Sequence, residues 1–197
     1  MGVTVEMIKQ LRGLTSAGVL DCRNALESAG GDMDRAQQIL REKGLAKAAR
    51  RAEREARQGL IEAYVHMNKA AALVELNCET DFVARTPEFK ALAHDLAMQV
   101  VAGNPRYVRV VDVPQSVVEG ETAMYRARLA DEKKPPEEVD KMVESELGKF
   151  YQEACIVKQL YIRDQSKTVQ DVINERIATI GENIVLRRFV RFELSED

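Results

Sequence analysis

Apolar residues recur at helical spacing in the first quarter of the chain. Thr4 precedes the first stripe, which consists of Val5, Ile8 and Leu11, and is expected to cap that helix. Two further stripes follow, formed by Val19, Cys22, Leu26 and Ala29, and by Met33, Ala36 and Leu40. Gly44 is expected to end the third helix. The pattern predicts a three-helix module over residues 1–44.

The next segment, residues 45–58, combines alanines with charged residues and has no wide apolar face. Its basic residues are Lys47, Arg50, Arg51, Arg54 and Arg57. Good helix formers without an apolar stripe are typical of a solvated helix, so we expect a charged linking helix. An RNA contact is the alternative interpretation of the same charges.

From Gly59 onward the apolar residues alternate with a period of two, which indicates strands. Ile61, Ala63 and Val65 share one face of the first expected strand, and Ala72, Val74 and Leu76 share one face of the second. Asn68 suits the turn between them. A hairpin over residues 59–78 follows, and a similar alternation predicts a C-terminal strand over 183–194 that could pair with it.

Helices are expected between these strands, within residues 87–180, and Gly181 is expected to close the last of them. Thr86-Pro87 opens one of them as cap and first position. Its apolar stripe consists of Phe89, Leu92, Ala93, Leu96, Ala97 and Val100. The predicted fold class is therefore α+β, with a core over residues 59–197 in which a small antiparallel β-sheet packs with helices.

Composition narrows the range of functions. Lys plus Arg is 29 and Asp plus Glu is 32, a net charge of −3, so the basic excess of a general nucleic-acid binder is absent and direct nucleic-acid binding is not expected. No apolar run is long enough for a membrane span, and no membrane partner is expected. Three scattered cysteines form neither a disulfide framework nor a metal pair. We expect a cytoplasmic protein.

The sequence carries no catalytic signature. It contains two histidines, His66 and His94, and neither has a metal-ligand spacing to other donors. Cys78 is conceivable as a nucleophile, but a buried structural thiol is the more common role of a free cysteine. We expect no enzyme, no cofactor and no metal site.

One segment does not read as scaffold: residues 77–85, which connect the second strand to a helix. Phe82 is the only aromatic residue in this turn, and Glu79, Thr80 and Asp81 precede it. A Phe usually packs in the core of its own subunit. The alternative is an apolar side chain presented beside a carboxylate, as at an interface anchor.

Three motifs together resemble elongation factor Ts, the bacterial guanine-nucleotide exchange factor for elongation factor Tu. The first is Leu76-Asn77-Cys78-Glu79-Thr80-Asp81-Phe82-Val83-Ala84-Arg85. The second is Leu11-Arg12-x-x-Thr15-x-Ala17-Gly18-x-x-Asp21-Cys22-x-x-Ala25-Leu26. The third is Ile180-Gly181-Glu182-Asn183-Ile184 running into Arg187-Arg188-Phe189 and Arg191-Phe192-Glu193. They occur in the family's order and span nearly the whole chain.

The resemblance implies that the N-terminal module is of the ubiquitin-associated (UBA-like) type and that the remainder is a dimerisation and exchange core. Long family members carry two copies of the core half and an inserted coiled coil. This chain has one hairpin region and no long heptad segment, so it looks like the short form. Short members are expected to act as homodimers.

The resemblance also implies a site. In the family, a Thr-Asp-Phe-Val turn enters the nucleotide-binding domain of elongation factor Tu and helps to dislodge its magnesium ion. That turn corresponds here to Thr80, Asp81, Phe82 and Val83. The family's N-terminal module touches a helix near the guanine pocket, which makes Arg12, Val19 and Leu20 the candidates for partner contact; Val19 and Leu20 stand where many members have Met-Met.

The expected function is thus a translation elongation factor that binds elongation factor Tu·GDP and promotes GDP release, remaining bound until GTP enters. An RNA- or ribosome-associated protein that uses residues 47–57 with Arg187, Arg188 and Arg191 is the leading alternative. Two others are an adaptor that grips a peptide through its three-helix module, and a hydrolase that uses Cys78.

Overall fold

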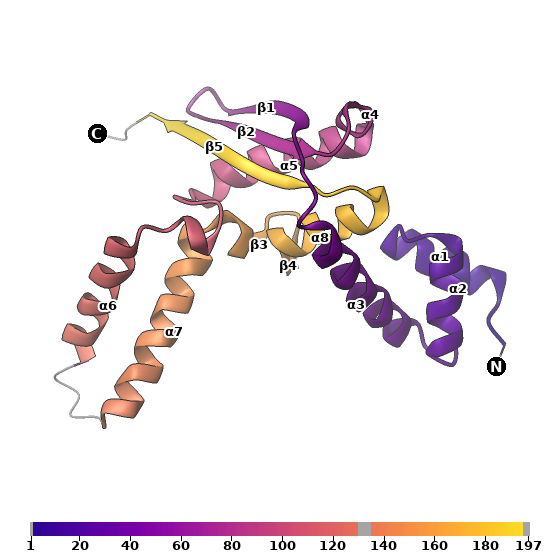
Figure 1. Ribbon diagram of the computed structural model, residues 1–197, viewed down its shortest axis with the longest axis horizontal. Helices are drawn as coiled ribbons and strands as arrows, with labels where there is room; N and C mark the ends of the chain where they lie inside the picture. The colour runs from indigo at the N-terminus through magenta and orange to yellow at the C-terminus, as the bar shows by residue number, and fades with distance from the viewer. Residues whose placement is uncertain (1, 130–134, 195–197) are drawn as a thin grey trace. The chain divides into compact units, whose positions relative to one another are not determined.

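The computed structural model describes residues 2–129 and 135–194 (Figure 1). The expected core range, 59–197, thus includes residues 130–134 and 195–197, which lie outside the described residues. The chain forms two compact units, treated separately below. Unit 1 comprises Met1–Leu60, Leu76–Phe89 and Asp171–Val185, and unit 2 comprises Ile61–Glu75, Lys90–Gln170 and Leu186–Asp197.

Unit 1 begins with three helices, α1 (Val5–Thr15), α2 (Val19–Ser28) and α3 (Met33–Arg51). The side chains of Thr4 and Asp32 cap α1 and α3 by accepting hydrogen bonds from backbone N–H groups of the first turn. The buried centre of this bundle consists of Leu11, Cys22, Ala25, Leu26 and Ala36. The other residues of the expected stripes form or pack against this core, whereas Val5 and Val19 are exposed.

The third helix does not end at Gly44, as the sequence led us to expect, but continues to Arg51. A single glycine inside a helix costs only about 1 kcal/mol, and the following Ala, Lys and Arg residues are strong helix formers. A Cβ at Gly44 would lie 3.5 Å from the Cβ of Ala178, so the glycine also faces a neighbouring helix. The expected linking helix over 45–58 is therefore the last part of α3 followed by a short connection to β1.

A three-stranded sheet with the order β1-β2-β5 contains the predicted hairpin and the C-terminal strand. The strands are β1 (Gln58–His66), β2 (Ala70–Cys78) and β5 (Val185–Glu193). Met67 and Asn68 have φ values of 49° and 58°, and the backbone N–H of Lys69 donates to the carbonyl of His66. Two left-handed residues make the tight turn that matches the strand twist.

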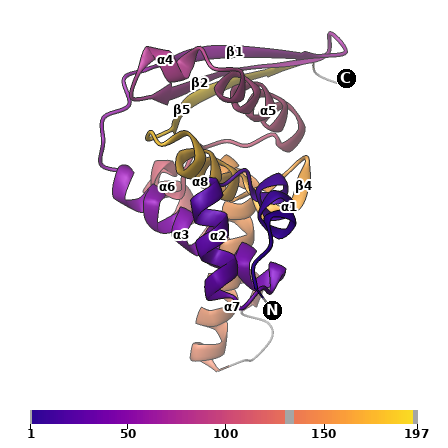
Figure 2. The ribbon, with the colours of Figure 1, turned by 90° about the vertical axis from the view of Figure 1, so that its right-hand side faces the viewer.

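In unit 2, α5 (Pro87–Gly103) covers one face of the sheet, as Figure 2 shows. Nδ1 of His94 lies 2.9 Å from Oε1 of Glu62 on β1, and the guanidinium of Arg191 on β5 donates to the carbonyl of Val101. The predicted stripe of α5 is buried throughout. Since Glu62 faces α5, the alternating residues Ile61, Ala63 and Val65 face away from it and are exposed.

The other elements of unit 2 follow α5. Helices α6 (Gln115–Leu129) and α7 (Pro136–Ala154) pack against each other, with an ion pair of 2.8 Å between Arg126 and Asp140. Short 3₁₀ turns at Val110–Asp112 and Ile156–Lys158 flank them. Strands β3 (Leu160–Tyr161) and β4 (Asp164–Thr168) form a second, antiparallel pair that the sequence did not suggest.

Helix α8 (Val169–Ile180) precedes β5. It ends at Gly181, as predicted: the residue has a φ of +95°, and its N–H donates to the carbonyl of Ile177. A left-handed glycine at this position is a common helix terminator. The helices and the small antiparallel sheet together make an α+β protein.

Candidate functional site

The turn between β2 and α5 presents Phe82 to solvent. Asp81–Ala84 forms the short helix α4, and Oγ1 of Thr80 accepts a hydrogen bond from the N–H of Val83 as its cap. Ala84 is buried and anchors one side of this helical turn, whereas Phe82 is 80% exposed. Each position of a helix is rotated by about 100° from the one before it, so Phe82 and Ala84, two positions apart, lie on roughly opposite sides of α4. The interpretation in which Phe82 packs into its own core is wrong.

The turn is tied internally by its polar side chains. An ion pair of 2.7 Å joins Asp81 to Arg85, and the hydroxyl of Thr86 donates to the carbonyl of Val83. The same hydroxyl accepts a hydrogen bond from the N–H of Phe89, which is fully buried at the start of α5. The backbone around Phe82 is thus connected to a buried anchor seven residues later.

A carboxylate from a distant part of the chain holds the start of the turn. Oε2 of Glu182 accepts hydrogen bonds from the backbone N–H of Glu79 at 3.1 Å and of Thr80 at 3.0 Å, and its Oε1 accepts one from the hydroxyl of Thr80 at 2.6 Å. In return, Oε1 of Glu79 accepts from the N–H of Asn183 at 2.7 Å. Glu182 belongs to the third motif, but sequence reasoning did not assign it a role.

The neighbouring Asn183 is buried and joins this arrangement to the end of α3. Its side-chain amide donates to the carbonyls of Arg54 at 2.7 Å and Ala52 at 3.4 Å. Nη1 of Arg54 lies 3.7 Å from Oε1 of Glu79. Three chain segments therefore meet beside the turn through paired polar groups, as buried polar groups require.

The predicted contact residues of the N-terminal helices are exposed. Val19 and Leu20 open α2 with exposures of 54% and 68%, and Arg12 lies on the last turn of α1. Leu14 is a further exposed apolar residue of α1, at 60%, which the sequence interpretation did not include among the contact candidates. Its position outside the stripe of Val5, Ile8 and Leu11 could have indicated that it is exposed. Among the described residues, no hydrogen bond joins these side chains to the Phe82 turn.

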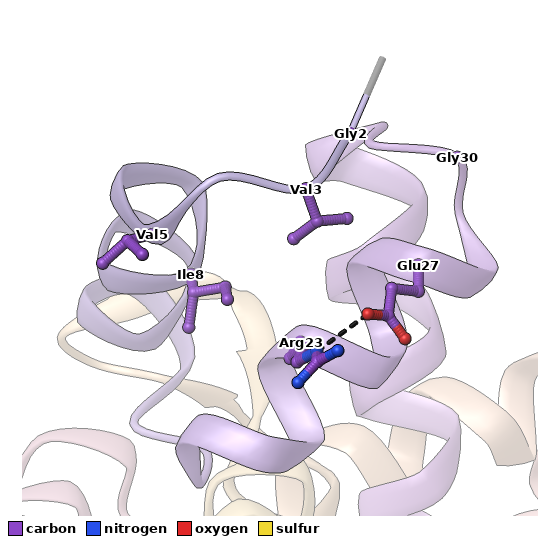
Figure 3. A pocket seen from close by; sticks show the side chains of 7 residues that line it. All are labelled: Gly2, Val3, Val5, Ile8, Arg23, Glu27 and Gly30. Atoms are coloured by element: carbon purple, nitrogen blue, oxygen red, sulfur yellow. Dashed lines mark hydrogen bonds and ion pairs between the residues drawn. The ribbon is translucent and has the colours of Figure 1, made fainter.

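The N-terminal helices also contain a hollow, shown in Figure 3. Val3, Val5 and Ile8 line one part of it, and Arg23 and Glu27 of α2, which form an ion pair of 2.8 Å, line another. None of the predicted contact residues lines this hollow. It is a mixed apolar and polar surface feature distinct from the Phe82 turn.

Cys78 is unsuited to nucleophilic chemistry. The thiol is fully buried, and burial, assisted by the negative charge of Glu182, raises its pKa to about 11. Its Sγ donates to the carbonyl of Thr80 at 3.1 Å. A reactive cysteine needs an accessible thiolate, so the thiol stabilises the structure beneath the turn, as expected.

The histidines lie on the sheet side of unit 2. Nδ1 of His66 is 3.0 Å from the hydroxyl of Tyr64, and His94 contacts the ring of Tyr64 edge-on. Within residues 2–129 and 135–194, no group of three or more His, Cys, Asp or Glu side chains is placed to hold a metal ion. In the same part of the chain, no helix has the length and apolar character needed to cross a bilayer.

Comparison with known proteins shows the family of the chain. A family model described as "Elongation factor TS" matches residues 32–177, more than half of the chain. The chain belongs to the elongation factor Ts family. Proteins named elongation factor Ts from Carboxydothermus hydrogenoformans and Thermotoga neapolitana are 53% and 52% identical to it. The first alignment covers 98% of this chain and 90% of the relative, and the second covers 100% of both.

A third relative, elongation factor Ts of Thermodesulfovibrio yellowstonii, is 47% identical over 196 residues and covers 100% of this chain and 98% of its own. The Phe82 turn lies inside the range matched by the elongation factor Ts family model, whereas Arg12, Val19, Leu20 and Glu182 lie outside it. The alignment with this relative nevertheless covers the whole chain, including these positions.

Proposed function

We propose that the chain is a guanine-nucleotide exchange factor that binds elongation factor Tu·GDP in the cytoplasm, promotes GDP release and stays bound until GTP enters. The observation that carries this proposal is the exposure of Phe82 on a fixed turn in a chain of the elongation factor Ts family. Exposed aromatic side chains on ordered turns are typical anchors of protein interfaces.

In the proposed mechanism, Thr80, Asp81, Phe82 and Val83 disturb the magnesium site of the partner GTPase. Burial of a Phe side chain contributes about 2–3 kcal/mol, which favours a rearranged nucleotide pocket. Loss of magnesium removes the cation that shields the phosphate charges of GDP. Exchange in this mechanism is a coupling between two binding equilibria and needs no covalent step. The factor weakens nucleotide binding by the same ratio as nucleotide weakens binding of the factor.

The side chains of the turn divide this work. Phe82 is the group that enters the partner, and Asp81 presents a carboxylate beside it, held by Arg85. Thr80 uses its hydroxyl to cap α4 and to bond Glu182, and Val83 is half-buried. Thr80 and Val83 thus mainly shape the turn, whereas Phe82 and Asp81 face the partner.

The N-terminal module supplies the second proposed contact. Arg12, Val19 and Leu20 would meet a helix near the guanine pocket of elongation factor Tu. Val19 and Leu20 are exposed aliphatic side chains at the start of α2, and Arg12 is an exposed cation on α1. Apolar side chains with polar groups around them are the usual composition of a protein interface. The UBA-like character of the module is part of this proposal.

We propose that the factor acts as a homodimer through the sheet face that α5 leaves open. Exposed apolar side chains of all three strands share this face: Ile61, Ala63, Val65, Leu73, Val190 and Phe192. Soluble monomers rarely expose an apolar area of several hundred Å². A second copy is the occupant, because two such faces would stack as in a β-sandwich.

The RNA-binding alternative has less support. Of the basic residues in 47–57, Lys47 pairs with Asp21 at 3.0 Å and Arg51 donates to the carbonyl of Ile177. Arg54 lies next to Glu79, and Arg57 pairs with Glu55. A phosphate-binding surface needs several cations that are free to face the backbone of the nucleic acid.

The test is release of fluorescent GDP from purified elongation factor Tu. We expect the wild-type chain to accelerate release, Phe82→Ala to lose most of that acceleration, and Asp81→Ala to lose less. Wild-type activity in the Phe82→Ala variant would refute the role of the ring. A larger loss in Asp81→Ala would reverse the ranking of the two residues.

A further inference from the structure

We infer that Glu182 is a positioning residue for nucleotide exchange: its carboxylate fixes the Thr80–Val83 turn so that Phe82 is presented in one direction. The inference rests on the proposed exchange function and adds to it a residue more than a hundred positions away along the chain. Glu182 touches neither nucleotide nor magnesium in this scheme and acts through the turn.

The hydrogen bonds leave little freedom at the start of the turn. Glu182 accepts from two consecutive backbone N–H groups and from the hydroxyl of Thr80, at 3.1, 3.0 and 2.6 Å. Hydrogen bonds to an ionised acceptor are stronger than those between neutral groups. All three donors lie within the four residues that precede Val83, so one side chain orients the peptide planes that lead into α4.

Glu182 is itself held in place from both sides. It follows Gly181, whose φ of +95° ends α8 and redirects the chain. It precedes Asn183, which is buried, donates its N–H to Glu79 and bonds the carbonyl of Arg54. The exchange of hydrogen bonds between residues 79–80 and 182–183 is therefore reciprocal and supported by a third segment.

A positioned ring and a loose ring differ in the entropy lost on binding. Ordering a backbone residue that was mobile opposes association, whereas a turn that is already ordered avoids this loss. Phe82 is 80% exposed, so packing against its own subunit constrains the ring only weakly. Its direction must therefore come from the backbone, and Glu182 supplies the long-range hydrogen bonds to that backbone.

The effect should appear in the exchange step more than in the initial binding. The N-terminal contacts proposed for Arg12, Val19 and Leu20 do not depend on Glu182. Without the carboxylate, the factor would still bind its partner but would insert Phe82 less often in the productive geometry. We expect a lower release rate at saturating factor and a nearly constant half-saturating concentration, the pattern for an interaction made mainly in the transition state.

The experiment compares Glu182→Gln with Glu88→Gln in the fluorescent GDP release assay. Glutamine keeps the volume but loses the charge, and when its oxygen accepts from the two N–H groups, its NH2 group replaces the acceptor of the Thr80 hydroxyl. Glu88 is an exposed carboxylate in the first turn of α5 and controls for the loss of one negative charge. Glu182→Gln should lower the saturating rate by about tenfold, with less than a threefold change in half-saturation, and Glu88→Gln should resemble the wild type.

Two readouts separate positioning from general damage. Amide hydrogen exchange should be faster at Glu79 and Thr80 in Glu182→Gln, while the buried strand β2 stays protected. In a double-mutant cycle, Glu182→Gln should add little to Phe82→Ala, because both act through the same ring. If Glu182→Gln folds poorly, Glu182→Asp, which keeps the charge but is one methylene shorter, should show the same effects at smaller size.

Wild-type saturating rates in both Glu182 variants would overturn the inference, and so would full additivity with Phe82→Ala. An equal loss in Glu88→Gln would also overturn it, because charge alone would then explain the effect. These results differ from failure of the proposed function, in which the wild-type chain itself would not accelerate GDP release. In that case the role assigned to Glu182 would fall together with the exchange function.

Discussion

The guanidinium of Arg51 donates a hydrogen bond of 2.8 Å to the backbone carbonyl of Ile177. Arg51 is the last residue of α3, and Ile177 lies in the last turn of α8, 126 positions later. The N–H of Gly181 also donates to this carbonyl, so Arg51 adds a second donor at the negative end of the helix dipole, where a cation is favourable. The basic end of α3 is therefore used inside unit 1.

Replacement of Arg51 should reduce stability. Arg51→Met keeps much of the aliphatic stem and removes the donor, so we expect a loss of about 1 kcal/mol in the free energy of unfolding. Arg50→Met is the matched control, because Arg50 is exposed and adjacent. Urea denaturation of both variants checks this. Equal midpoints for the two would mean that the hydrogen bond contributes nothing measurable.

Replacement of the two phenylalanines near the turn should change the free energy of unfolding by very different amounts. Phe89 is fully buried, and Phe89→Ala should destabilise the protein by about 3–5 kcal/mol. Phe82 is 80% exposed, and Phe82→Ala should change stability by less than about 0.5 kcal/mol. Thermal or urea unfolding followed by circular dichroism gives both values. A large loss in Phe82→Ala would show that the ring supports the fold.

Charge placed on the open face of the sheet should break the proposed homodimer. Phe192→Lys introduces a cation at a position that is 69% exposed in the single chain but would be buried between two copies. Burial of an unpaired charge is strongly unfavourable, so the dimer should weaken by at least about a hundredfold. Analytical ultracentrifugation measures this directly.

A lysine elsewhere provides the control for that experiment. Leu14 is similarly exposed but lies on the N-terminal helices, so Leu14→Lys should leave the dimer intact. A wild-type chain that sediments as a monomer at micromolar concentration would contradict the dimer proposal. Equal dissociation by both variants would place the interface somewhere other than the sheet.

Stability should fall at high pH because of Cys78. Burial holds its folded-state pKa at about 11, above an ordinary value of 9.0. Between these two pKa values the folded protein keeps a proton that the unfolded chain releases. By linkage, the contribution of this thiol to the free energy of unfolding is fully present below pH 9 and declines as pH rises toward 11. The decline due to this thiol should be on the order of 2 kcal/mol.

Cys78→Ala isolates that contribution from other groups that titrate in the same range. The variant should be somewhat less stable at pH 7, and its stability should decline less steeply than the wild type between pH 9 and pH 11. Urea unfolding at a series of pH values supplies the comparison. Parallel curves for the two proteins would mean that the thiol titrates normally in the folded state.

Much of the fold follows from local patterns. The stripe from Phe89 to Val100 is buried, and the hairpin turn lies at Asn68. Gly181 ends its helix because only glycine adopts its left-handed conformation readily. These predictions succeed because spacing and turn chemistry are properties of neighbouring residues.

The remainder depends on contacts between distant residues. Gly44 reads as a helix end, but helix-forming neighbours and the approach of Ala178 keep α3 continuous. The shared face of Ile61 and Val65 was visible in the sequence, but only the position of α5 decides that this face is the open one. Strand alternation specifies which residues share a face and not which face is covered.

The candidate site divides in the same way. The sequence identified Phe82 as unusual but did not decide between a core position and an exposed one, since that depends on how Ala84 and Phe89 anchor the turn. The three hydrogen bonds from residues 79–80 to Glu182 span more than a hundred positions, and no local pattern announces such a contact.

The solvent-facing ring at position 82 has a consequence for how this chain can change over time. The side chain contributes almost nothing to folding, so substitution by smaller or more polar residues would cause neither misfolding nor degradation. Such a change would affect only the binding of a partner. A hydrophobic residue at this position is therefore explained by binding to another molecule and not by folding.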